Sequence, residues 1–346
     1  MFGYSLPQKF GTRKYSRQDD CWRVNYGRLK AGGFAVTVCV AAMCAGNILL
    51  GASDRMLTAG DVEFEPETPK LYPITNSCVA MIAGESSLQM SIVQRVMQVA
   101  VDAIKEKPTE WMPIRVIADC YHSVYQSIKS EKAAARVLGP LGLTMNDFLT
   151  RQRDMQPNVV SQLTSEILNF DMPAIEAVIA GLDPTGAHIF VVNNAEVACR
   201  DAIGFAAIGV GYWHANSQFM FAGHNRNRPL PETLLLTYAA KRRAEVAPGV
   251  GTGTDMFTAG PNLGTYTVVN PNIVDDLEKI YKKTRAQAAE SVKSSNVEVN
   301  KYVENLGKEA TTQQQSPPPP EQPKTNGQDK GGQDGEADIG TAPKPS

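Results

Sequence analysis

The most informative segment of this chain reads Thr37-Val-Cys-Val-Ala-Ala-Met-Cys-Ala-Gly-Asn-Ile-Leu-Leu-Gly-Ala-Ser-Asp54. It carries no charge before its last residue, and Ala45-Gly-Asn47 divides it into two apolar runs. Glycine and asparagine favour the tight turns of β-hairpins, and short continuous apolar runs are typical of strands buried on both faces. The segment therefore predicts two buried and paired strands, at residues 37–44 and 48–54.

The uncharged run extends back to Phe34 and follows a basic leader, so a signal sequence or membrane anchor is an alternative interpretation. The turn residues Gly46 and Asn47 argue against one continuous apolar helix. Met43 precedes Cys44, where a lipoprotein signal requires a small residue. We therefore expect no membrane segment and a cytoplasmic protein.

Two further strands are predicted, at residues 70–75 and 79–84. Each of the four predicted strands has a chemically distinctive residue at one end, and these residues are Thr37, Asp54, Lys70 and Gly84. A sheet protein can carry an aspartate and a lysine at strand ends by chance, so the residues need a pattern before they indicate a site.

The intervals between these residues supply that pattern. They match Asp-x-x-x-Thr-x-Gly…Lys…Ala-Gly at five positions, which are Asp54, Thr58, Gly60, Lys70 and Gly84. This resembles the N-terminal-nucleophile (Ntn) hydrolases, and within them the proteasome subunits and their bacterial relatives. The interval from Thr37 to Asp54 is one residue longer than in the family, which the turn at 45–47 can absorb. The resemblance spans about residues 37–270 and implies an α+β fold, a four-layer αββα sandwich.

The resemblance also implies a role for each residue. Thr37 would be the nucleophile of an amide or peptide hydrolase, with Asp54 and Lys70 beside it, and the Gly84 N–H would stabilise the oxyanion. Thr58 and Gly60 would bind the substrate, and Glu245 would stand where the family has an aspartate. A free α-amine has a pKa of about 8, so it can accept the proton of the weakly nucleophilic threonine hydroxyl.

This chemistry requires Thr37 to become the first residue of the mature chain. Residues 1–36 precede it, and Val36 stands where family precursors carry a glycine. Two explanations stay open: 1–36 is a propeptide removed by self-cleavage, or translation starts at a valine codon for Val36. If neither holds, Thr37 is an internal strand residue and the protein is inactive.

Three departures from the family bear on activity. Val210 and Pro248 replace two serines that support the terminal amine, and Glu245 replaces the aspartate. Valine and proline side chains have no polar group with which to replace a hydroxyl. The alternative function is therefore a non-catalytic, proteasome-like scaffold or binding subunit.

The rest of the chain follows the order of helices and strands of the sandwich. We expect helices at 87–106, 114–137 and 232–246, a helical insert at about 139–173, and strands at 174–183, 188–193 and 264–270. A charged helix is expected at 271–293, followed by a disordered tail rich in Pro, Gln and Gly at 294–346.

The composition limits the kinds of partner that we expect for this chain. The net charge of −2 gives no electrostatic case for nucleic acid. The 6 cysteines and 4 histidines show no metal spacing, so we expect neither metal nor cofactor. The expected partners are a peptide or small amide substrate and, as the resemblance implies, further copies of the chain in a homo-oligomer such as a ring.

Overall fold

The computed structural model describes residues 37–59, 62–67 and 69–314. The predicted leader, 1–36, lies outside the described residues, and so does the last part of the predicted tail, 315–346. The chain divides into two compact units, Met1–Lys283 and Thr284–Ser346. The first unit contains all the strands described below.

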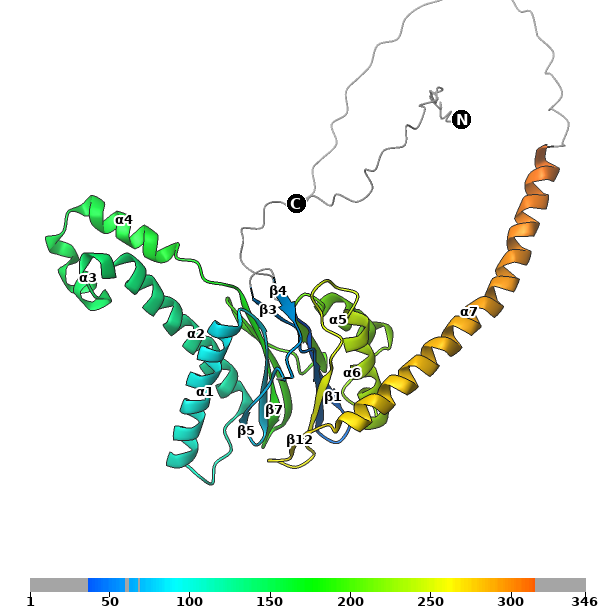
Figure 1. The fold of residues 1–346 in the computed structure, drawn as a ribbon, viewed down its shortest axis with the longest axis horizontal. Helices are drawn as coiled ribbons and strands as arrows, with labels where there is room; N and C mark the ends of the chain where they lie inside the picture. Colours follow the sequence, from blue (N-terminus) through cyan, green and yellow to red (C-terminus); the bar gives the residue numbers. More distant parts are fainter. Residues whose placement is uncertain (1–36, 60–61, 68, 315–346) are drawn as a thin grey trace, which may run out of the picture. The chain divides into compact units, whose positions relative to one another are not determined.

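Two five-stranded sheets form the centre of the first unit, and every pairing within them is antiparallel (Figure 1). The first sheet has the order β10-β1-β2-β11-β12, with β1 (Cys39–Cys44), β2 (Ile48–Ser53), β10 (Phe205–Ile208), β11 (Asp255–Ala259) and β12 (Tyr266–Val268). The second has the order β5-β6-β7-β8-β9, with β5 (Leu71–Thr75), β6 (Cys78–Gly84), β7 (Ile175–Asp183), β8 (Gly186–Asn193) and β9 (Val197–Cys199). A small separate sheet pairs β3 (Leu57–Ala59) with β4 (Val62–Phe64).

The hairpin predicted at residues 37–54 is present as β1 and β2. Cys39 pairs with Ser53 at its open end and Cys44 with Ile48 next to the turn. Within the turn, Gly46 and Asn47 have φ angles of 81° and 57°, which are left-handed values that these two residue types tolerate best.

The two large sheets share one apolar core. It contains Met43 from β1 and Phe257 from β11, together with Met81 from β6 and Val178 from β7, all at most 1 % exposed. Side chains from one face of each sheet therefore interdigitate, as in other face-to-face sheet packings.

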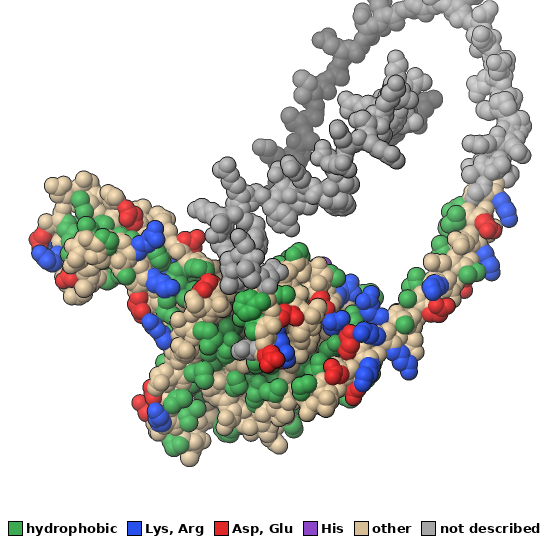
Figure 2. Space-filling model, viewed as in Figure 1, with side chains coloured by type: hydrophobic (Ala, Val, Ile, Leu, Met, Phe, Trp, Pro, Cys, Tyr) green, Lys and Arg blue, Asp and Glu red, His purple; other side chains and the backbone are tan. Residues whose placement is uncertain are grey.

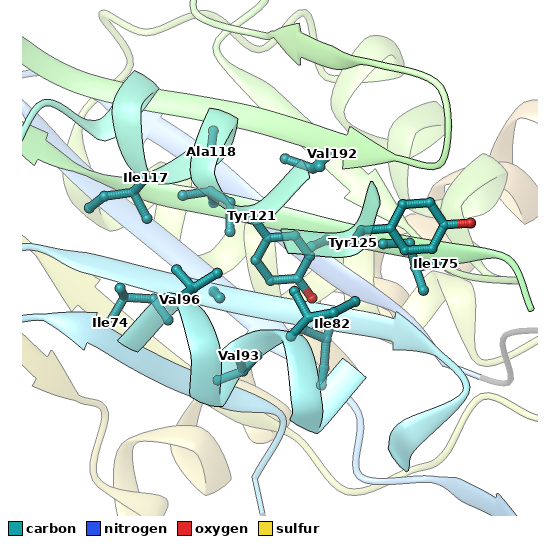
Figure 3. Packing of buried hydrophobic residues seen from close by; sticks show 14 of the residues in the cluster. Ile74, Ile82, Val93, Val96, Ile117, Ala118, Tyr121, Tyr125, Ile175 and Val192 are labelled. Carbon is teal, nitrogen blue, oxygen red and sulfur yellow. The ribbon is translucent and has the colours of Figure 1, made fainter. Parts of the chain in front are cut away.

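Helices cover the other face of each sheet. Helices α1 (Ser86–Glu106) and α2 (Ile114–Val137) pack on the second sheet, where Tyr121 of α2 lies among Val96, Ile82 and Val192 (Figure 3). Helices α5 (Tyr212–Phe221) and α6 (Leu230–Ala244) pack on the first sheet, through a cluster that contains Val40, Phe219 and Leu236. The predicted α+β class is confirmed: the described residues combine antiparallel sheets with seven α-helices.

The expected insert at 139–173 is helical. It contains α3 (Met145–Arg151) and α4 (Pro157–Leu168), each next to a short 3-10 turn (Gly139–Leu141 and Gln152–Asp154). Thr144 and Asp147 form a capping box at the start of α3. The insert has its own small apolar cluster around Leu138, Phe148 and Leu163.

The sequence interpretation missed five short strands: β3, β4, β9, β10 and β11. The last of these is the important omission, because β11 pairs with β2 inside the first sheet. Its sequence, Asp-Met-Phe-Thr-Ala, is short and follows the glycine-rich stretch 249–254, so it shows no clear period of two. The partner strand, and not the local pattern, makes it a strand.

The last helix is longer than expected. Helix α7 (Pro271–Gln314) includes the charged helix expected at 271–293 but continues beyond it, so the expectation of disorder is wrong for residues 294–314. Charged and polar side chains recur along residues 271–306 of this helix (Figure 2). The low apolar content of this stretch predicts disorder, yet Glu, Lys and Gln are also good helix formers.

Candidate functional site

Strand pairing brings Thr37 and Asp54 together. Thr37 lies just before β1 and Asp54 just after β2, and these strands are antiparallel with Cys39 opposite Ser53. One more backbone hydrogen bond, from Asp54 N to Val38 O at 3.1 Å, continues the ladder to this point. Lys70 precedes β5 of the other sheet, so both sheets contribute to the site.

The three side chains are in direct contact. Thr37 Oγ1 donates to Asp54 Oδ1, and Lys70 Nζ donates to Thr37 Oγ1. Lys70 Nζ also lies 3.1 Å from Asp54 Oδ1 and donates to the carbonyl oxygen of Met56. Thr37 is 2 % exposed, Asp54 0 % and Lys70 5 %. A lysine and an aspartate are rarely buried to this extent unless they pair with each other.

Backbone N–H groups fix the Asp54 carboxylate. Oδ1 accepts from Val38 N at 3.1 Å, while Oδ2 accepts from Met56 N at 3.2 Å and from Gly251 N at 2.9 Å. The carboxylate therefore has a defined orientation before any substrate binds, which is what precise positioning of a nucleophile requires.

Gly84 ends β6 in a conformation that suits glycine. Its φ is 124°, and a Cβ at this position would lie 2.7 Å from the carbonyl oxygen of Ala174. Cys39 Sγ lies 3.5 Å from Ile82 O. This contact connects β1 to β6 two residues before Gly84. Between these described residues, no hydrogen bond joins Gly84 to Thr37, Asp54 or Lys70.

Glu245 does not touch the three central side chains. It follows the end of α6, and its carboxylate accepts hydrogen bonds from Lys241 Nζ at 2.7 Å and Arg242 Nη1 at 2.9 Å. Its link to Asp54 is indirect, through Lys241 and the loop that contains Gly251. Val210 packs against the cluster beneath α5, and Pro248 is exposed.

Of the two residues expected to bind substrate, the structure describes only Thr58. Thr58 is in β3, opposite Glu63 of β4. Gly60 lies outside the described residues, between these two strands.

Three residues at the site were missed as functional candidates. Gly209, with φ 83°, packs so closely on the carbonyl of Thr37 that a Cβ would overlap it, and its N–H donates to Glu176 Oε2 at 2.7 Å. Glu176 had no sequence signal beyond being a charge inside an apolar strand.

The third missed residue is Lys241, a fully buried lysine on α6. Burial lowers the pKa of Lys241 from its ordinary value, and the hydrogen bond to Glu245 opposes that shift. A lysine on the apolar face of a predicted helix was the available signal, because such a residue must find a partner when the helix packs.

Burial suppresses the reactivity of the two thiols of β1. It raises the pKa of Cys39, two residues after Thr37, and raises that of Cys44 to about 11. The thiolate is the reactive form of cysteine, so neither thiol competes with the threonine hydroxyl near neutral pH. Among the described residues, no three His, Cys, Asp or Glu side chains form a group that could hold a metal ion.

Comparison with known proteins gives no family assignment. No protein-family model matches this chain, and no curated protein matches it in sequence either. None of the helices in the described part of the chain is both long and apolar enough to cross a membrane.

Proposed function

We propose that the chain is an Ntn hydrolase of the proteasome-subunit type, with Thr37 as its nucleophile. The observation that carries the proposal is the contact of Thr37 Oγ1 with both Asp54 and Lys70. Three residues that resemble a family pattern in sequence thus meet in space, from the ends of two different sheets. The helices on the outer face of each sheet support a four-layer αββα sandwich as the finer description of the fold.

The proposed chemistry is amide hydrolysis in two steps. Thr37 Oγ1 attacks the carbonyl carbon of a peptide or small amide, and its proton passes to the freed α-amine of Thr37, or to Lys70 Nζ when that group is in its neutral amine form. The Gly84 N–H stabilises the charge that develops on the carbonyl oxygen, an effect of about 3 kcal/mol for one donor. The amine leaves with a proton, and water then hydrolyses the ester on Thr37 and restores the hydroxyl.

The second candidate is a non-catalytic subunit that binds or assembles. It is favoured by Val210 and Pro248, which offer no hydrogen bond to a terminal amine. The buried Lys70–Asp54 pair favours catalysis instead, because a scaffold gains little from a buried ion pair. Assembly into a homo-oligomer such as a ring and a cytoplasmic location belong to the proposal under either candidate.

The deciding experiment compares amidase activity in matched variants purified from the native host. Thr37→Ala and Lys70→Ala should each lose activity by on the order of a thousandfold, with the fold retained. Lys132→Ala, which changes an exposed lysine on α2, serves as the control and should keep full activity.

N-terminal sequencing of the same samples completes the test. A mature chain that begins at Thr37 is expected, whichever route exposes the residue. Retention of the peptide bond between Val36 and Thr37, together with no activity, would move the assignment to the scaffold.

A further inference from the structure

Lys241 is a buried ammonium group that the proposed chemistry does not use. It lies on α6 with its side chain 0 % exposed. Its ammonium donates to Glu245 Oε1 at 2.7 Å, to Gly251 O at 2.9 Å and to Thr252 O at 3.0 Å. All three donors of the ammonium are therefore used, and two of them hold the backbone of one loop.

That loop also contacts the candidate active site. Gly251 donates its N–H to Asp54 Oδ2 at 2.9 Å, from the same residue whose carbonyl oxygen Lys241 binds. The loop is held on another side by Glu65, which accepts from Gly253 N at 3.2 Å and from Thr252 Oγ1 at 3.3 Å. A Cβ at Gly251 would overlap the Glu65 carboxylate, which would have to move away.

The contacts form one connected path. Lys241 fixes Gly251, Gly251 fixes one oxygen of Asp54, and the other oxygen of Asp54 contacts Thr37 and Lys70. We propose that Lys241 is a positioning residue for the Thr37 site, which acts through Gly251 to hold Asp54 in place. This inference rests on the proposed function, because Asp54 needs a fixed orientation only if Thr37 reacts.

Lys241 and Lys70 therefore have different tasks. Lys70 touches the reacting hydroxyl, while Lys241 reaches it only through a backbone amide and a carboxylate. Removing Lys241 leaves the nucleophile and Lys70 present but frees the loop that holds Asp54. Misplacement of a catalytic group lowers the rate of the chemical step more than it weakens substrate binding.

The test uses Lys241→Met, which keeps most of the aliphatic chain and removes the donors. We expect kcat to fall about tenfold with KM changed less than twofold. Thr237→Val is the matched control, because Thr237 is also fully buried on α6 and its hydroxyl has no hydrogen-bond partner. It should leave kcat unchanged, and an equal fall of kcat in both variants would overturn the positioning role.

A second readout does not depend on activity. The Gly251 amide proton, followed by NMR hydrogen exchange in the full chain, should be protected in the native protein and lose protection in Lys241→Met. Exchange of the Gly251 amide at the rate of an unstructured peptide in the native protein would overturn the proposal, even if Lys241→Met does not fold.

The two proposals can fail separately. If Thr37→Ala keeps full activity, the proposed function is wrong, whatever Lys241 does. If Thr37→Ala is inactive while Lys241→Met keeps both kcat and the protected Gly251 amide, only the positioning role of Lys241 is wrong.

Discussion

At the scale of single residues, burial and hydrogen bonding explain the site better than charge alone. Asp54 is fully buried, and its Oδ2 accepts hydrogen bonds from two backbone N–H groups, those of Met56 and Gly251. Sequence spacing could indicate Thr37, Asp54 and Lys70, because each stands at the end of a predictable strand. It could not indicate Gly251 or the partners of Lys241, since these contacts depend on how α6 packs on the first sheet.

Gly84 should be costly to replace. Gly84→Ala places a side chain in a conformation with φ 124° and brings its Cβ to 2.7 Å from Ala174 O, so we expect a loss of about 3 kcal/mol of unfolding free energy. Gly46→Ala is the matched control, since its φ is 81° and nothing lies within 4 Å of its Cβ. A loss of about 1 kcal/mol is expected there. Urea unfolding measures both, and equal losses would show that the close contact contributes nothing.

His224 should make stability depend on pH. Burial lowers the pKa of His224, whose ring nitrogen lies 3.0 Å from the carbonyl oxygen of Met43. The folded pKa lies below the unfolded value of about 6.5, so the unfolded state binds more protons as the pH falls. The stability contribution is therefore complete above about pH 6.5 and is lost as the pH falls towards the folded pKa.

The measurement is urea unfolding between pH 7.5 and pH 5, compared with His224→Gln, which keeps an N–H donor. The variant should show a flatter decline of unfolding free energy than the native chain. An identical decline in both proteins would assign the pH dependence to other groups.

At the scale of elements, patterns of apolar residues identified most of the helices and paired strands. Helix α2 begins and ends at the predicted residues, because Pro113 precedes it and its apolar stripe is continuous. β11 was missed because its five residues become a strand only through pairing with β2 and β12. The C-terminal part of α7 was missed because a polar sequence can favour both helix and disorder.

The first turns of α7 should stabilise the first unit. Leu277 is 6 % exposed and packs in a cluster with Tyr238 and Met256, whereas Ile273 is 47 % exposed. Leu277→Ala should lower the unfolding free energy by about 3 kcal/mol, because it leaves a cavity, and Ile273→Ala by less than about 1 kcal/mol. Chemical denaturation compares the two, and a similar small effect of both would mean that this part of α7 does not pack as described.

At the scale of the molecule, the first unit contains several separate apolar cores. One lies between the two large sheets, and a much smaller one belongs to the insert around Phe148. The sequence predicted the insert as a departure from the family pattern, but its separate core could not be foreseen because it depends on the fold-back of α4. Separate cores predict separate local stabilities.

Phe148→Ala should therefore loosen the insert alone. Phe148 is 4 % exposed, and its loss should increase amide exchange in α3 and α4 while β1, β2 and β6 keep their protection. Hydrogen exchange followed by mass spectrometry resolves these segments. Loss of protection in the sheets as well would show that the insert and the sheets unfold as one unit.

The most direct test of the central claim is to map the covalent adduct of a hydroxyl-reactive β-lactone by tandem mass spectrometry on the protein from its native host. We expect one acyl group on Thr37, at the N-terminus of the mature chain, and no adduct in Lys70→Ala. An unlabelled Thr37 in a chain that nevertheless hydrolyses amides, or an adduct on another residue of such a chain, would contradict it.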